Sequence, residues 1–237
     1  MTLPQDQVMQ FLDDNFVLGT SNIEKQEHVG ISHGYKPCQT AVGTTNGAGG
    51  RNVQMVVLAA DDTVIHVLPG FWHADDLIAE LTFATKLHEL YRDETRAPES
   101  RDAMFAAMHR AFVRRQSPET LGRSRWQGFD VWYEMNRSKS EARDVFLLGD
   151  DGQPLAGENG QFQVKPICQL VHDRMAQQPF RKLADFDMES FVDYGQPFYD
   201  NNQGLDKGRN FPRAVAANKK RELDQAKERK KLDAASN

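Results

Sequence analysis

Two cysteines, Cys38 and Cys168, are the only side chains in this 237-residue sequence that could carry out thiol chemistry. Cys38 stands in the run Tyr35-Lys-Pro-Cys-Gln-Thr, where the neighbouring Lys36 and a loop setting would favour the reactive thiolate. No Cys-x-x-Cys pair provides a resolving thiol, and two cysteines form at most one bridge. We therefore expect unreactive thiols, with a reactive Cys38 or a Cys38–Cys168 disulfide as the alternatives.

The histidines match no metal-binding motif. His28 and His33 are five residues apart, and His66 and His73 flank the end of a predicted strand. A metal site needs three or four converging donors, and neither paired Cys-x-x-Cys motifs nor His-Glu-x-x-His supplies them. We expect surface or packing histidines, no bound metal and no cofactor.

A glycine-rich run, Gly47-Ala-Gly-Gly-Arg-Asn, precedes the first strongly apolar segment. Its backbone N–H groups could hold an anion. Phosphate loops, however, follow a strand and open a helix, whereas here a strand follows the glycines. A tight backbone passage is the simpler interpretation. No Gly-x-Ser-x-Gly or other nucleophile signature occurs, so the sequence offers no catalytic residue.

The composition excludes several classes of protein. The formal charge of −5 argues against a dedicated binder of nucleic acid or of an anionic membrane. No window approaches 18 consecutive apolar residues, and the first residues carry no signal-peptide pattern. A mean hydropathy of −0.64 is polar for a globular protein, so we expect part of the chain to lie outside any core.

The chain divides into three parts. Residues 1–93 alternate helix and strand signals, and residues 94–211 form a helical and irregular extension that is expected to pack on them. Residues 212–237 contain eight Lys or Arg against four Asp or Glu and few large apolar residues. That composition is typical of a solvated helix or a disordered tail.

Apolar periodicity predicts the elements that would position any site. The apolar runs 53–60 and 63–68 are separated by Asp61-Asp62, which predicts a β-hairpin. Pro69-Gly70 ends the second strand. A short strand is expected from Phe16 onward. Helices are expected at four places: after Pro4, over 75–92 with Asp75 or Asp76 as the N-cap, from Pro98, and after Pro166.

The N-terminal part resembles a known family. The run Asn52-Val-Gln-Met-Val-Val-Leu-Ala-Ala-Asp-Asp-Thr-Val-Ile-His-Val-Leu-Pro-Gly-Phe-Trp-His-Ala-Asp-Asp-Leu-Ile-Ala-Glu-Leu looks like the C-terminal half of a thioredoxin-like domain, with its final hairpin, a following glycine and its last amphipathic helix. Upstream, Gln5-Asp-Gln-Val-Met-Gln-Phe-Leu-Asp-Asp-Asn-Phe-Val-Leu is similar to the helix and strand that follow the family's redox motif. The resemblance implies an α/β, thioredoxin-like fold over residues 5–92.

Three features of that family have no counterpart here. The Cys-x-x-Cys is absent, and the glycine-rich run stands where the family has the cis-proline of its substrate groove. The central strand that leads into the redox motif is also missing. The segment 145–148 is a candidate to fill its place in the sheet.

The resemblance therefore implies a redox-inactive module that binds protein or peptide partners. The alternative is a thiol–disulfide oxidoreductase whose Cys-x-x-Cys lies upstream of a misassigned start. The sequence as written predicts a cytoplasmic protein, whereas an upstream start would predict a periplasmic or secreted one. The candidate binding residues lie before the hairpin and just after it: Cys38, Asn46, Gly47, Gly49, Gly50, Arg51 and Trp72.

Overall fold

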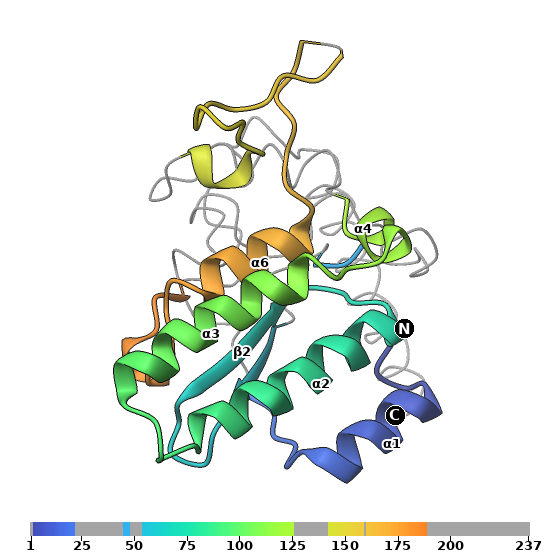
Figure 1. The fold of residues 1–237 in the computed structure, drawn as a ribbon. Coiled ribbons are helices and arrows are strands. Elements are labelled where there is room, and N and C mark those ends of the chain that lie inside the picture. Colours follow the sequence, from blue (N-terminus) through green and yellow to red (C-terminus); the bar gives the residue numbers. More distant parts are fainter. Residues whose placement is uncertain (1, 22–44, 48–53, 126–141, 159, 189–237) are drawn as a thin grey trace, which may run out of the picture.

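The structure is a computed structural model, and it describes residues 2–21, 45–47, 54–125, 142–158 and 160–188. Within these ranges lie helices, two short 3-10 turns and one hairpin (Figure 1). In chain order the elements are α1 (Asp6–Asn15), β1 (Gln54–Leu58), β2 (Val64–Pro69), α2 (Ala74–Tyr91), α3 (Pro98–Val113), α4 (Pro118–Arg123), η1 (Ala142–Val145), α6 (Ile167–Met175) and η2 (Leu183–Asp185). None of these helices combines the length and the apolar character that crossing a bilayer requires.

The predicted hairpin is confirmed. β1 and β2 pair antiparallel, with Gln54 opposite Pro69 and a register irregularity between Val57 and Leu58. The acidic turn works because Asp62 adopts φ 64°, a left-handed conformation that aspartate tolerates better than most residues. Gly70, at φ 72°, turns the chain out of β2 toward α2.

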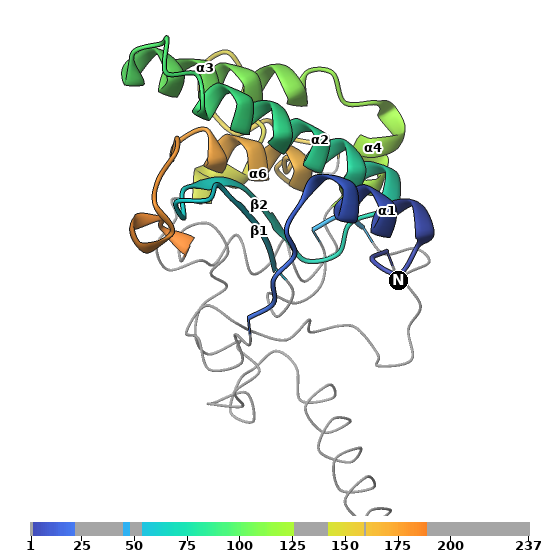
Figure 2. The ribbon, with the colours of Figure 1, turned by 90° about the horizontal axis from the view of Figure 1, so that it is seen from below.

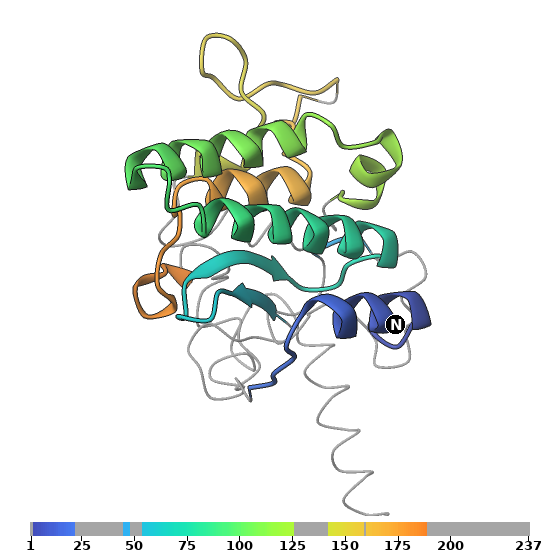
Figure 3. The same cartoon turned by 60° about the horizontal axis from the view of Figure 1, so that its bottom comes forward.

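The described elements form three layers, of which the first is the β1–β2 hairpin (Figures 2 and 3). α2 and α6 both pack against β2, and α3 lies across α2 and α6 on the side away from the hairpin (Figures 2 and 3). α1 packs beside α2. All six residues of β2 are buried, so this strand lies at the centre of the described structure.

One apolar core joins the N-terminal part to the described part of the extension. Its members come from α1, the hairpin, α2, α3 and α6, and the largest fully buried side chains include Trp72, Ile65, Leu87, Phe105 and Met175. The helix predicted after Pro166 is confirmed as α6, and its apolar positions are buried against this core. The segment at 181–183 also belongs to this assembly, because its backbone hydrogen-bonds to Asp62 in the hairpin turn and to Val64 at the start of β2.

Two strand predictions are wrong. The residues from Phe16 to Thr20 form no strand, and the side chain of Val17 is fully exposed. Segment 145–148 does not join the hairpin; Phe146 forms an isolated bridge to Val164 instead. The tight turn after Leu148 explains the second result, because it returns the chain at once and gives the segment a local partner. Within the described residues the sheet has two strands.

The position of Leu87 in the core gives a first prediction. We expect Leu87→Ala to lower the free energy of unfolding by about 2–5 kcal/mol, because a side chain with no exposed surface would leave a cavity. Leu155→Ala makes the same chemical change at a side chain that is 41% exposed, and should cost about 0.5 kcal/mol or less. Urea unfolding measures both; equal losses would contradict this placement of α2.

Candidate functional site

Four polar side chains meet inside the apolar core. His66 comes from β2, Glu80 from α2, His109 from α3 and His172 from α6, and each residue is at most 1% exposed. We call these four residues the His–Glu cluster. Each occupies an inward position of its element. Glu80 lies beside Leu77 and Ala84, His66 and His172 lie among buried residues of β2 and α6, and His109 lies one turn after the buried Phe105.

Glu80 is the centre of the cluster. Its Oε2 atom lies 3.0 Å from Nε2 of His66 and 3.1 Å from Nε2 of His172. Its Oε1 atom lies 3.3 Å from the same nitrogen of His172. The other ring nitrogen of His172, Nδ1, lies 2.7 Å from Nδ1 of His109. A continuous polar chain therefore runs from α3 through α6 to α2 and β2.

The hydrogen bonds can be assigned by counting N–H groups. If all three imidazoles are neutral, they carry three N–H groups: two donate from Nε2 to Glu80, and the third donates from Nδ1 of His109 to Nδ1 of His172. The remaining ring atoms, Nδ1 of His66 and Nε2 of His109, are buried and have no partner. A further proton on any member would leave an N–H group without an acceptor among the described residues.

The cluster holds an ionised carboxylate in the core. Burial alone would raise the pKa of Glu80, but attraction to His172 and hydrogen bonds from both histidines outweigh burial and lower that pKa to about 2. Burial lowers the pKa of His66 despite its bond to Glu80, and it holds the pKa of His109 well below the ordinary value. At neutral pH, His66 and His109 are therefore neutral and Glu80 is charged.

Aromatic rings close the cluster off from solvent. The ring of Phe83 lies 5.0 Å from that of His109 and 5.3 Å from that of His172, measured between centroids. Phe105 contacts His109, and Phe112 contacts His172. Bulk water is therefore kept from these polar atoms, and the electrostatic interactions inside are strong.

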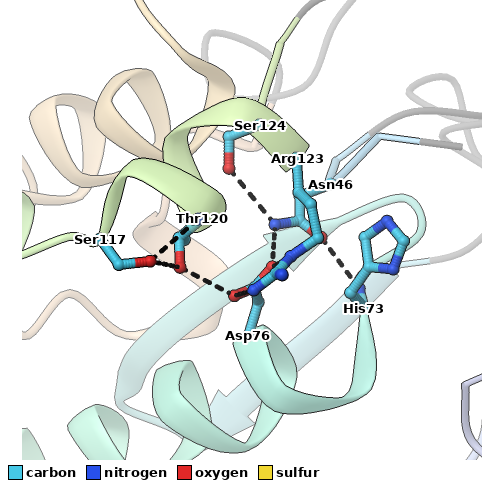
Figure 4. Close-up of polar contacts among 7 residues, drawn as sticks. All are labelled: Asn46, His73, Asp76, Ser117, Thr120, Arg123 and Ser124. Carbon is cyan, nitrogen blue, oxygen red and sulfur yellow. Dashed lines mark hydrogen bonds and ion pairs between the residues drawn. The ribbon is translucent and has the colours of Figure 1, made fainter. Parts of the chain in front are cut away.

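A second polar group lies one helical turn away, at the start of α2 (Figure 4). The carboxylate of Asp76 accepts hydrogen bonds from Nε and Nη2 of Arg123 at 2.8 and 2.7 Å, from Thr120 at 3.0 Å and from Asn46 at 2.7 Å. The hydrogen bonds outweigh the effect of burial and lower the pKa of Asp76. We call Asp76, Asn46, Thr120 and Arg123 the Asp76 junction.

The junction corrects the prediction for the start of α2. The sequence favours Asp75 or Asp76 as the N-cap, but the cap residue is His73 and its side chain makes no capping bond. Asn46 contributes to capping the helix instead, because its Oδ1 accepts a hydrogen bond from the backbone N–H of His73. Asp76 is thereby free to bind α4.

The predicted binding residues fall into two groups. Asn46 is 1% exposed, with its polar atoms bound inside the junction (Figure 4), and Trp72 is buried with Nε1 donating to the carbonyl of Pro69. Gly47 is buried at φ 66°, and a Cβ there would lie 2.6 Å from Ile167. Cys38, Gly49, Gly50 and Arg51 lie outside the described residues.

Cys168 lies among the described residues, and it is a buried free thiol. It lies on α6 with no exposed surface, and burial raises the pKa of its thiol to about 11. The neutral thiol is therefore the form present at neutral pH.

Sequence reasoning missed Glu80, His109 and His172 as site residues. Their positions, 80, 109 and 172, follow no spacing motif, because they come from three different helices. One signal existed: each interrupts the apolar face of a predicted helix, for example His109 between Phe105 and Phe112. A polar residue at such a position must find a partner in the core.

Comparison of the chain with protein-family models, with curated proteins and with solved structures found no match. A functional assignment therefore depends on the geometry of the described residues.

The Asp76 junction gives a second prediction. We expect Asp76→Asn to lower the free energy of unfolding by about 2–3 kcal/mol at pH 7, because Arg123 would lose its charged partner. The folded-state pKa of Asp76 is lowered, so its contribution is present above the unfolded pKa of about 3.9 and is lost as the pH falls below it. The difference between the two proteins should therefore shrink below pH 4.

Urea unfolding between pH 3 and pH 7 measures this difference. Asp75→Asn is the matched control, since it removes the same charge from an exposed side chain one residue earlier. It should cost much less than Asp76→Asn at pH 7. A difference between wild type and Asp76→Asn that is independent of pH would contradict the role of the Asp76 carboxylate.

Proposed function

We propose that this protein binds one divalent transition-metal ion in its core, through Nε2 of His66, Nε2 of His172 and the carboxylate of Glu80. The observation that supports this proposal is the convergence of these ligand atoms, which all lie within 4.8 Å of one another and are buried. His109 contacts His172 and lies outside the set of ligands.

The charges in the core favour a bound cation. α2 buries two carboxylates one turn apart, and Asp76 is neutralised by Arg123. Among the described residues no lysine or arginine pairs with Glu80; its partners are the two imidazoles. If both imidazoles are neutral, the carboxylate has no countercharge, and burying it costs several kcal/mol. A proton on an imidazole would neutralise the cluster and leave one buried N–H group unpaired. A divalent ion would change the net charge of the cluster from −1 to +1, and it would add strong bonds to two nitrogens and to the carboxylate.

The donor atoms suit an ion such as zinc. Zinc binds imidazole nitrogen and carboxylate oxygen at about 2.0–2.2 Å, so neighbouring ligand atoms lie roughly 3–4 Å apart. The distances of 3.0 and 3.1 Å between Glu80 and the two histidines agree with that spacing. Both carboxylate oxygens face His172, so a bidentate Glu80 would complete four donor atoms.

Metal binding would leave two buried N–H groups without acceptors, at Nδ1 of His66 and at Nε2 of His109. Each costs about 1–3 kcal/mol. Structural zinc sites contribute about 10–16 kcal/mol in small peptides, which exceeds this cost.

The role of such an ion would be structural. Closed coordination without a site open to solvent distinguishes structural from catalytic zinc sites, and the three ligand side chains are at most 2% exposed. The ion would join β2, α2 and α6, and so fasten the extension to the hairpin and its helix.

A metal titration tests the proposal. We expect the full chain, equilibrated with chelator-buffered zinc, to bind one ion per chain by elemental analysis. Because a ligand that binds only the folded state stabilises it by mass action, zinc at 100 times its dissociation constant should add about 2.7 kcal/mol to the free energy of unfolding. Cobalt in place of zinc should give the absorption of a nitrogen–oxygen site.

Glu80→Gln should abolish both effects while leaving the metal-free protein folded, because the amide keeps the shape of the side chain and removes a buried charge. Two controls keep the ligands: His88→Ala changes a histidine on α2 outside the cluster, and the His28→Ala/His33→Ala double variant removes other possible zinc donors. The proposal fails if wild type binds no zinc, or if Glu80→Gln binds it equally well. The cluster would then be a hydrogen-bonded core group.

A second candidate function is the redox-inactive thioredoxin-like binding module expected from the sequence. The observation that favours it over an oxidoreductase is the burial of Cys168, the one cysteine among the described residues. The N-terminal segment of the protein also presents exposed apolar side chains suited to a protein or peptide partner. They are Leu3, Met9, Val17 and Leu18.

Insulin-disulfide reduction tests this candidate. We expect no turnover by the chain, because Cys168 is a neutral buried thiol and no Cys-x-x-Cys is present. A Cys38→Ser variant is the control for any slow reaction of the second thiol. Catalytic reduction by this chain would contradict the candidate, and activity gained only with added upstream sequence would favour the oxidoreductase alternative.

A further inference from the structure

His109 is the one member of the His–Glu cluster that the proposed metal site leaves without a role. It lies on α3, is fully buried, and contacts the cluster through one polar atom, Nδ1, 2.7 Å from Nδ1 of His172. Its other nitrogen has no hydrogen-bond partner. A buried imidazole that makes one hydrogen bond and leaves one nitrogen unsatisfied is costly to keep in a core, so the bond to His172 needs an explanation.

The chemistry of imidazole supplies that explanation. A histidine that binds a metal through Nε2 carries its proton on Nδ1, and this N–H group needs an acceptor. In His172 the Nδ1 atom faces His109 and the Nε2 atom faces Glu80. The nitrogen of His172 that would be protonated in the metal-bound form points at Nδ1 of His109, which can accept once the His109 proton is on Nε2. The nitrogen that would bind points at the other ligand.

Among the described residues, the immediate surroundings of Nδ1 of His172 are mostly aromatic. The rings nearest to these two histidines belong to Phe83, Phe105 and Phe112, which accept no conventional hydrogen bond. His172 is 1% exposed, which keeps bulk water from Nδ1. Among the described residues, His109 is the hydrogen-bond partner of that nitrogen.

We propose that His109 is the positioning residue of the metal site: it accepts the hydrogen bond from Nδ1 of His172 and so fixes the tautomer and ring orientation in which Nε2 binds the ion. This inference rests on the proposed function. His109 itself does not contact the metal, and α3 takes part in the site through this one bond. Outer-shell partners of this kind change metal affinity by about 10–100-fold.

The two histidine ligands should then differ. Nδ1 of His66 has no partner, whereas Nδ1 of His172 has His109. The His172 ring is fixed by hydrogen bonds at both nitrogens, while the His66 ring is held at one nitrogen and by packing. Loss of His109 should therefore affect His172 and leave the contact between His66 and Glu80 in place.

The test compares zinc affinity in wild type, His109→Gln and His109→Leu, by competition with a chromophoric chelator. Glutamine retains an oxygen that can accept from His172, and leucine retains bulk without an acceptor. We expect about 10–100-fold weaker binding in His109→Leu and substantial recovery in His109→Gln. Thermal unfolding of the metal-free proteins shows whether each variant folds. The cobalt spectrum reports whether the ligand geometry changes; if His109 had only a packing role, that geometry would stay the same.

Nitrogen-15 NMR of the zinc-loaded wild type provides a second measurement that needs no variant. His172 should carry its proton on Nδ1 and bind through Nε2; the reverse arrangement would overturn the inference even if His109→Leu failed to fold. Equal zinc affinity in wild type and a folded His109→Leu would also overturn it while leaving the metal site intact. Absence of zinc binding by wild type would overturn the proposed function and this inference together.

Discussion

The burial of the Glu80 carboxylate is the constraint around which the described structure is arranged. A charge in an apolar core has to be compensated nearby, and the compensating groups here come from three other elements. β2 supplies His66, α6 supplies His172, and α3 supplies His109 behind it. The packing of helices over the hairpin is therefore an electrostatic arrangement as well as an apolar one. Helices that moved apart would leave Glu80 without partners.

α2 buries two carboxylates on one face, and different kinds of side chain compensate the charge of each. Asp76 lies near the start of the helix, where an arginine with a partly exposed side chain reaches it from α4. Glu80 lies one turn deeper, beyond the reach of a long side chain with its charged end in water, and is surrounded by imidazoles. Asn46 and Gly47 also have structural roles, since they hold residues 45–47 against α2, α4 and α6.

Much of the secondary structure follows from local sequence, whereas the site does not. The hairpin and the helices after Pro98 and Pro166 carry strong periodicity and clear boundaries, and they form as predicted. The strand expected at Phe16 fails because apolar character alone supplies no pairing partner. The His–Glu cluster depends on how three helices approach one strand, and pairwise spacing along the chain contains no information about that approach. Burial of Glu80 was readable from its place beside Leu77 and Ala84; its partners were not.

The separation of 92 residues between Glu80 and His172 sets the order in which the core can assemble. β2 and α2 are adjacent along the chain, so His66 and Glu80 can meet through a short loop closure, whereas α6 must close a far longer one. At ribosomal rates, residue 172 emerges roughly 5–20 s after residue 80. During that interval the nascent hairpin and α2 expose to water the apolar face that α6 will cover. Until α6 arrives, this uncovered apolar face is open to aggregation or to chaperone binding.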